Sequence, residues 1–124
     1  MHFTQREQTA LREAGLSTQE IAGASEAVVA ATEADAERVA SFVEGHEVLY
    51  SDMDLAHSAE EFPEHAVEYF DLFTHADDIR GYLRFDSWGV PVEGARVLSE
   101  DVVELSLGPT VDARVRFAAD RDAL

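Results

Sequence analysis

The first 45 residues have the spacing of apolar positions that is typical of helices. Thr4 and Glu7 stand three apart, as in a capping box, and Gly15 lies where the helix that they begin would end. Residues 24–44 place apolar side chains three and four positions apart, which predicts a longer amphipathic helix. Gly45 would end that helix.

A second capping box, Ser17 with Glu20, predicts a short helix between these two that ends near Gly23. Residues 11–22 also resemble the first half of a helix-turn-helix. The helix that would read DNA next carries several carboxylates and one arginine, Arg38. Because phosphate repels carboxylates, we do not expect DNA binding.

After residue 45, β-branched and aromatic residues replace alanine, and apolar and polar positions alternate as in strands. The expected strands are 48–51, 67–74, 79–86, 102–107 and 111–117. The stretch 52–64 reads as irregular, and Trp88–Pro91 reads as a turn. Two hairpins are expected, one across His75–Asp78 and one around Gly108 and Pro109.

Helices followed by antiparallel strands predict an α+β fold. We expect the N-terminal helices to pack on one face of a mostly antiparallel sheet of four to five strands, with the other face in water. The 124 residues suit one domain, with a helical part at 1–45, a sheet part at 46–118 and a charged tail at 119–124.

The outward face of this sheet would concentrate positive charge. Strand alternation places five polar or aromatic side chains on it, namely Arg80, Tyr82, Arg84, Arg114 and Arg116. Guanidinium groups pair with carboxylates and phosphates, so this face is a candidate site for a protein partner or a small anionic ligand. The alternative is that these arginines form cross-strand ion pairs with the carboxylates Glu68, Asp71, Glu104 and Asp112.

Aromatic residues suggest two further roles. Trp88, in a turn beside glycine and proline, either anchors a partner or closes one end of the core, and the core role is the commoner one. Phe62, Tyr69, Phe70 and Phe73 would place apolar side chains on both faces of one strand. Such a strand is either central in the sheet or meets a second copy in a homodimer.

Carboxylates and imidazoles gather between residues 46 and 75. The candidate metal ligands are Asp52, Asp54, His57, His65 and His75. Their oxygen and nitrogen atoms suit zinc, manganese or iron, and an open coordination position could activate water in a metal-dependent hydrolase. The spacing matches no established ligand motif, so solvated carboxylates and hydrogen-bonded histidines are the alternative.

Charge is the strongest compositional signal. The chain has 26 acidic residues and nine basic ones, all of them arginine, for a net charge of −17. Repulsion among so many like charges destabilises a compact state in dilute buffer. Molar salt reduces the Debye length to about 3 Å and so screens this repulsion. We therefore expect folding to depend on salt.

The absence of lysine, the abundant alanine and the scattered carboxylates resemble small acidic haloarchaeal proteins of unknown function. This resemblance covers the chain and implies a cytoplasmic protein without assigning an activity. No apolar run suits a signal peptide or a membrane span, which favours the same location. The leading interpretation is a small halophilic cytoplasmic binding module, and the second is the metal-dependent hydrolase.

Overall fold

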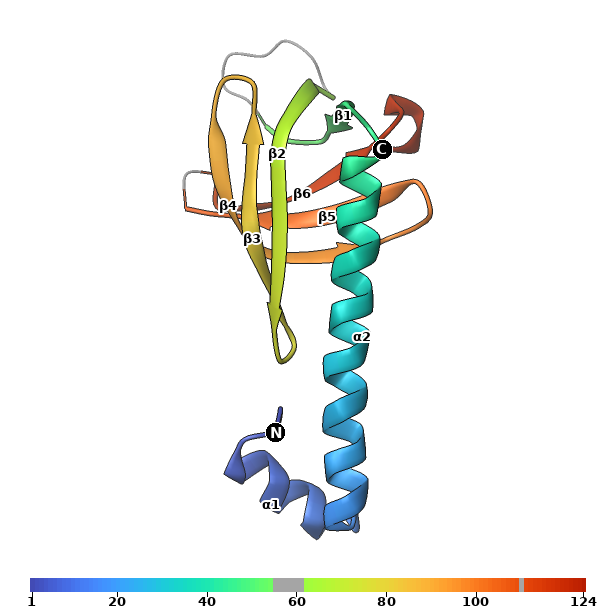
Figure 1. The fold of residues 1–124 in the computed structure, drawn as a ribbon, viewed down its shortest axis with the longest axis vertical. Coiled ribbons are helices and arrows are strands. Elements are labelled where there is room, and N and C mark those ends of the chain that lie inside the picture. The colour runs from blue at the N-terminus through green and yellow to red at the C-terminus, as the bar shows by residue number, and fades with distance from the viewer. Residues whose placement is uncertain (55–61, 110) are drawn as a thin grey trace.

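The computed structural model describes residues 1–54, 62–109 and 111–124 (Figure 1). Within them the elements follow in the order α1 (Gln5–Glu13), α2 (Thr18–Glu44), β1 (Val48–Ser51), β2 (Glu64–His75), β3 (Asp78–Phe85), β4 (Gly89–Val97), β5 (Val102–Leu107), β6 (Ala113–Ala118) and a 3-10 turn, η1 (Arg121–Ala123). Helices precede strands, so the fold is α+β, as predicted.

Both predicted capping boxes form. The Ser17 Oγ accepts the Glu20 N–H at 3.1 Å, and a Glu20 carboxylate oxygen accepts the Ser17 N–H at 3.0 Å. The helix that begins there does not end near Gly23 but continues to Glu44, so the two predicted helices are one. A glycine inside a helix costs only about 1 kcal/mol, which the packing of the rest of α2 outweighs.

The strands form a closed antiparallel barrel in the order β1-β2-β3-β4-β5-β6, with β6 pairing back to β1. The prediction of four to five strands was too low, since six are present in the described residues, and β4 is the strand that was missed. The sequence predicts a turn at Trp88–Pro91, but Gly89 and Pro91 belong to β4, where Pro91 pairs with Tyr82 of β3. The turn lies earlier, where the Phe85 N–H donates to the Trp88 carbonyl at 2.7 Å.

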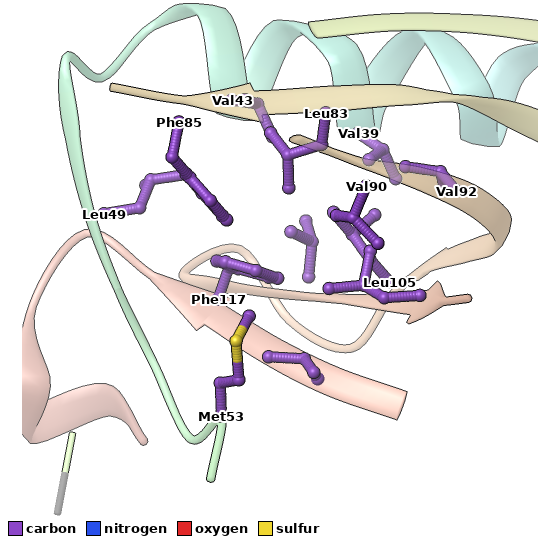
Figure 2. Packing of buried hydrophobic residues seen from close by; sticks show 13 residues of the cluster. Val39, Val43, Leu49, Met53, Leu83, Phe85, Val90, Val92, Leu105 and Phe117 are labelled. Carbon is purple, nitrogen blue, oxygen red and sulfur yellow. The ribbon is translucent and has the colours of Figure 1, made fainter. Parts of the chain in front are cut away.

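Because the sheet closes into a barrel, its apolar face packs mainly against itself. Figure 2 shows Phe85, Phe117 and Leu105 directed into the barrel, where each is at most 1% exposed. The prediction that helices cover this face holds only for α2, which adds Val39 and Val43 to the same core. Most of the apolar face is instead buried against the opposite wall of the barrel.

The helix α1 stands apart from the core. It lies at the far end of α2, beyond the barrel, and none of its residues is buried (Figure 1). The N-terminus returns toward the turn between β2 and β3, where the His2 Nδ1 lies 3.7 Å from an Asp77 carboxylate oxygen. The barrel with α2 is therefore the part of the molecule that can position a site rigidly.

The barrel closes at a short seam. β1 pairs with β6 at only two positions, Tyr50 with Ala118 and Ser51 with Phe117. By comparison, the β2–β3 hairpin is paired along nearly its whole length. The seam is thus the part of the ring with the fewest paired residues.

Candidate interaction surface

β2 directs aromatic side chains into solvent because its register shifts between Val67 and Tyr69. Before the shift, His65 faces the core, and after it Phe70 does. The extra residue reverses the alternation, as a β-bulge does, and turns Tyr69 and Phe73 outward. This explains the apolar residues on both faces of the strand that the sequence showed.

The outward side chains of β2 and β3 form a compact surface of three cross-strand pairs. These pairs are Tyr69 with Arg84, Asp71 with Tyr82, and Phe73 with Arg80. We call these six residues the aromatic–arginine face. Tyr69 is 52% exposed, Phe73 is 60% exposed and Tyr82 is 41% exposed. Three large rings in solvent on two adjacent strands are unusual for a surface without a partner.

Two glycines hold this face in place. A Cβ atom on Gly89 of β4 would collide with the Tyr82 hydroxyl and ring, so the absence of a side chain there lets Tyr82 lean over β4. A Cβ on Gly81 would collide with the backbone carbonyl of Asp71 and lie 2.9 Å from Leu72 Cδ2. The close approach of the strands therefore requires glycine at 81, and the position of Tyr82 requires it at 89.

Carboxylates lie close to both arginines of this hairpin. The Arg84 Nε lies 3.5 Å from a Glu68 carboxylate oxygen, with both side chains about half exposed. Arg80 has no ion-pair partner within the described residues, and Asp71 lies one cross-strand pair away from it. Glu68 and Asp71 therefore offset the charges of Arg84 and Arg80, and the exposed Asp78 lies two positions before Arg80 on β3.

The other two predicted arginines do not join this face. Arg114 and Arg116 lie on β6, which is separated from β3 by two strands in either direction around the ring. Arg116 is also engaged: its N–H and its Nε each donate to an Asp52 carboxylate oxygen at 2.8 Å. The single positive surface that strand alternation predicted is therefore divided between opposite sides of the barrel, because alternation does not show where a strand stands in the ring.

The alternative of cross-strand ion pairs is realised in part. Arg84 pairs with Glu68, as that alternative proposed, but Glu104 pairs with Arg96 of β4, with Nε 2.8 Å from the carboxylate oxygen. Arg96 was not predicted to lie on the sheet, because no strand was expected between the turn at Trp88–Pro91 and residue 102.

The predicted metal ligands are not brought together. His65 and His75 lie at opposite ends of β2, ten positions apart, which at strand spacing is about 33 Å. Asp52 bonds to Arg116, Asp54 is exposed, and His57 lies outside the described residues. Among the described residues, no three histidine or carboxylate side chains converge as a metal site requires. Asp52 serves instead to extend the β1–β6 seam.

His65 belongs to a buried hydrogen bond that the sequence did not predict. Its Nε2 lies 2.6 Å from the Ser51 Oγ, and that oxygen also accepts the Met53 N–H at 3.2 Å. The ring stacks on Phe85 with 4.6 Å between centroids. Burial lowers the pKa of the His65 imidazole, with the nearby Asp86 carboxylate opposing that shift.

This serine–histidine pair is placed for stability rather than for nucleophilic attack. Ser51 is 0% exposed and His65 is 6% exposed, so no substrate carbonyl can reach the hydroxyl oxygen in this conformation. The pair joins β1 to β2 beside the seam. The signal that could have found it is that both residues occupy inward positions of adjacent strands.

Trp88 takes the core role. It packs edge-on against Phe85 with 4.9 Å between ring centroids and is partly buried against the barrel core. It closes one end of the barrel and is not part of the aromatic–arginine face.

A groove of about 540 Å³ runs between α2 and the β4–β5 turn. Its floor includes Phe42 and Val103, and its single cation, Arg38, is accompanied by Glu37 and Glu100. Carboxylates outnumber the arginine, so the groove does not favour an anion. It also lacks the convergent polar groups that fix a small ligand.

The fold and its surfaces define a small α+β barrel domain with an exposed face of aromatic and arginine side chains. The chain belongs to a family of unknown function (DUF7532), whose model matches residues 1–122. No curated protein and no solved structure matches it. In the described residues, no helix is both long enough and apolar enough to span a membrane.

Proposed function

We propose that this chain is a protein-binding module of the cytoplasm that works at high salt and holds its partner on the aromatic–arginine face. The observation that carries the proposal is the exposure of Tyr69, Phe73 and Tyr82 beside Arg80 and Arg84 on two rigid strands. Aromatic residues and arginine are enriched in protein interfaces, and tyrosine and arginine are frequent among the residues that dominate binding energy.

The energetics favour this use of the face. Fully burying one phenylalanine side chain stabilises a complex by about 1.5 to 3 kcal/mol, and three rings are available here. Because Tyr82 is already positioned over Gly89, less side-chain freedom is lost on binding than for a mobile side chain. Molar salt screens the repulsion that the net charge of −17 would exert on an acidic partner.

A protein partner suits this face better than a small anion or a nucleic acid. Small ligands favour concave sites, whereas the outer wall of a barrel is convex. Two arginines balanced by Glu68 and Asp71 supply no net positive charge for phosphate. The aromatic rings instead offer apolar area that only a large surface can cover.

Photo-crosslinking in the native host tests this proposal. A benzophenone amino acid replaces Phe73 on the face or Arg114 on β6, the matched exposed control. We expect Phe73 to give a protein adduct that is lost when Tyr69→Ser and Arg84→Ala are added and kept when Arg114→Ala is added. No adduct at position 73, or equal adducts at both positions, would contradict the proposal.

A further inference from the structure

We infer that the partner on the aromatic–arginine face is a second copy of this chain, arranged about a twofold axis that runs parallel to β2 and β3. This inference rests on the proposed function and names its partner. The argument comes from the arrangement of the three cross-strand pairs, which makes the face complementary to itself.

On this face, β2 carries two aromatic residues and one carboxylate, whereas β3 carries both arginines with a tyrosine between them. β2 supplies Tyr69, Asp71 and Phe73, and β3 supplies Arg84, Tyr82 and Arg80 in the matching order. When two such faces pack with a twofold axis along the strands, each β2 lies over the β3 of the other copy. This rotation leaves the position of each residue along the strand direction unchanged.

This arrangement brings unlike groups together. Tyr69 of one copy then lies over Arg84 of the other, and Phe73 lies over Arg80, so that two cation–π pairs form on each side of the axis. Asp71 lies over Tyr82, which carries a hydroxyl group. Each of the three residues on β2 therefore faces a different kind of group on β3 of the other copy, and among these six residues no like charges lie opposite each other.

A twofold axis across the strands gives the opposite result. It inverts the height along the strand, so Asp71 would lie over Asp71 and Arg84 would lie over Arg80 of the other copy. Like charges in direct opposition oppose association, and the penalty grows as water is excluded. The charge pattern therefore selects the axis along the strands.

The acidic helix supports the same choice. α2 runs beside β2 (Figure 1), and the grooves between them are lined by Glu33, Glu37 and Glu44. The axis along the strands places the two α2 helices on opposite sides of the interface, whereas the axis across the strands would place them on the same side. The six residues of the face carry two arginines and one carboxylate, so they do not add to the repulsion between two copies of charge −17.

Sedimentation equilibrium in molar potassium chloride tests the dimer. We expect a mass that approaches twice 13.7 kDa as concentration rises. Tyr69→Ser with Phe73→Ser should weaken dimerisation at least tenfold, and Arg80→Glu should weaken it as well. Arg114→Glu, which makes the same charge change on β6, should leave it within twofold. Circular dichroism checks that each variant is folded.

Crosslinking tests the direction of the axis on a chain that has no cysteine. Packed sheets lie about 10 Å apart, beyond the reach of a disulfide, so a short bismaleimide is used. We expect His75→Cys chains to crosslink to one another, because an axis along the strands keeps the two copies of this exposed residue at the same position along β2. An axis across the strands at Asp71 would instead separate the two His75 residues by about 26 Å, beyond the reach of the reagent. A dimer that persists in sedimentation while His75→Cys chains fail to crosslink would overturn the inferred axis.

The two proposals fail separately. A mass of 13.7 kDa at all concentrations would overturn the dimer. In that case an adduct between position 73 and a different protein would still support the binding module, and the absence of any adduct would refute both.

Discussion

Replacing Ser51 with alanine should destabilise the barrel more than any other loss of a single hydroxyl. The substitution removes the oxygen that bonds His65 Nε2 at 2.6 Å and the Met53 N–H at 3.2 Å. Both partners are buried, at 6% and 4% exposure, so water cannot replace the lost bonds easily. Each unsatisfied buried polar group costs about 1 to 3 kcal/mol, so the two together predict a loss of about 2 to 6 kcal/mol.

Urea titration in molar potassium chloride measures this loss. The fluorescence of Trp88 reports unfolding, since this single tryptophan packs on Phe85, which also contacts His65. Ser41→Ala is the matched control, because Ser41 is exposed on α2 and its loss should change stability by no more than about 0.5 kcal/mol.

A double substitution separates the hydrogen bond from packing. His65→Phe keeps a ring against Phe85 and removes the group that needs a partner. We expect Ser51→Ala with His65→Phe to be less destabilised than the sum of the two single changes, with a coupling of at least about 1 kcal/mol. If Ser51→Ala costs no more than Ser41→Ala, the stabilising role of the pair is refuted.

Four further outcomes are expected. Gly81→Ala should destabilise the barrel by several kcal/mol, because the added Cβ would collide with the Asp71 backbone. Gly23→Ala has open space around the added Cβ and should stabilise α2 by about 1 kcal/mol. Thermal melts of the two variants test both expectations. Burial lowers the pKa of His65, so the unfolded state binds a proton more readily than the folded state does. The free energy of unfolding should therefore fall as pH drops below the ordinary pKa of 6.5, by at most about 1.4 kcal/mol per pH unit. Urea titrations at several pH values measure this dependence, and His65→Phe should remove the part that comes from His65. Asp52→Ala should lower the free energy of unfolding by about 1 to 3 kcal/mol, because two charge-assisted hydrogen bonds to Arg116 are lost, and Asp52→Asn should lower it less. We call these two bonds the Asp52 clamp, and equal stability of the wild type and the alanine variant in urea would show that the clamp does not stabilise the barrel. Helical circular dichroism should decrease in about 50 mM salt and be restored at molar salt, and an unchanged spectrum would show that the charge does not make folding depend on salt.

Local signals in the sequence located the helix starts and most strands. The capping boxes at Thr4 and Ser17 fixed where α1 and α2 begin, because a cap depends only on residues within one turn. Alternation likewise showed that Leu83 and Phe85 face inward. It could not show what they face, since the helix and the far wall of a barrel are both apolar.

The ring itself depends on pairing between distant segments. β1 meets β6 about 67 residues further along the chain, and no local pattern encodes that contact. For the same reason, Arg80 and Arg114 were correctly placed on outward positions and wrongly placed on one surface. Tyr69 and Phe73 were visible as aromatic residues on the second strand face, but their exposure depends on the shift after Val67, which only the pairing register reveals.

The short seam between β1 and β6 sets how the molecule could exchange parts with another copy. Two residue pairs and the Asp52 clamp hold it, so it is the least costly place for the ring to open. Opening leaves unpaired backbone groups on β1 and β6, and each edge can then pair with the matching edge of a second chain. Exchange of α1, α2 and β1 between copies would require more than the seam to open, because β1 also pairs with β2 at three positions and α2 packs Val39 and Val43 into the core. The Asp52 N–H crosses the seam and donates to the Arg116 carbonyl at 3.2 Å, so amide hydrogen exchange at Asp52 faster than at Leu105 would mark the seam as the point where opening begins.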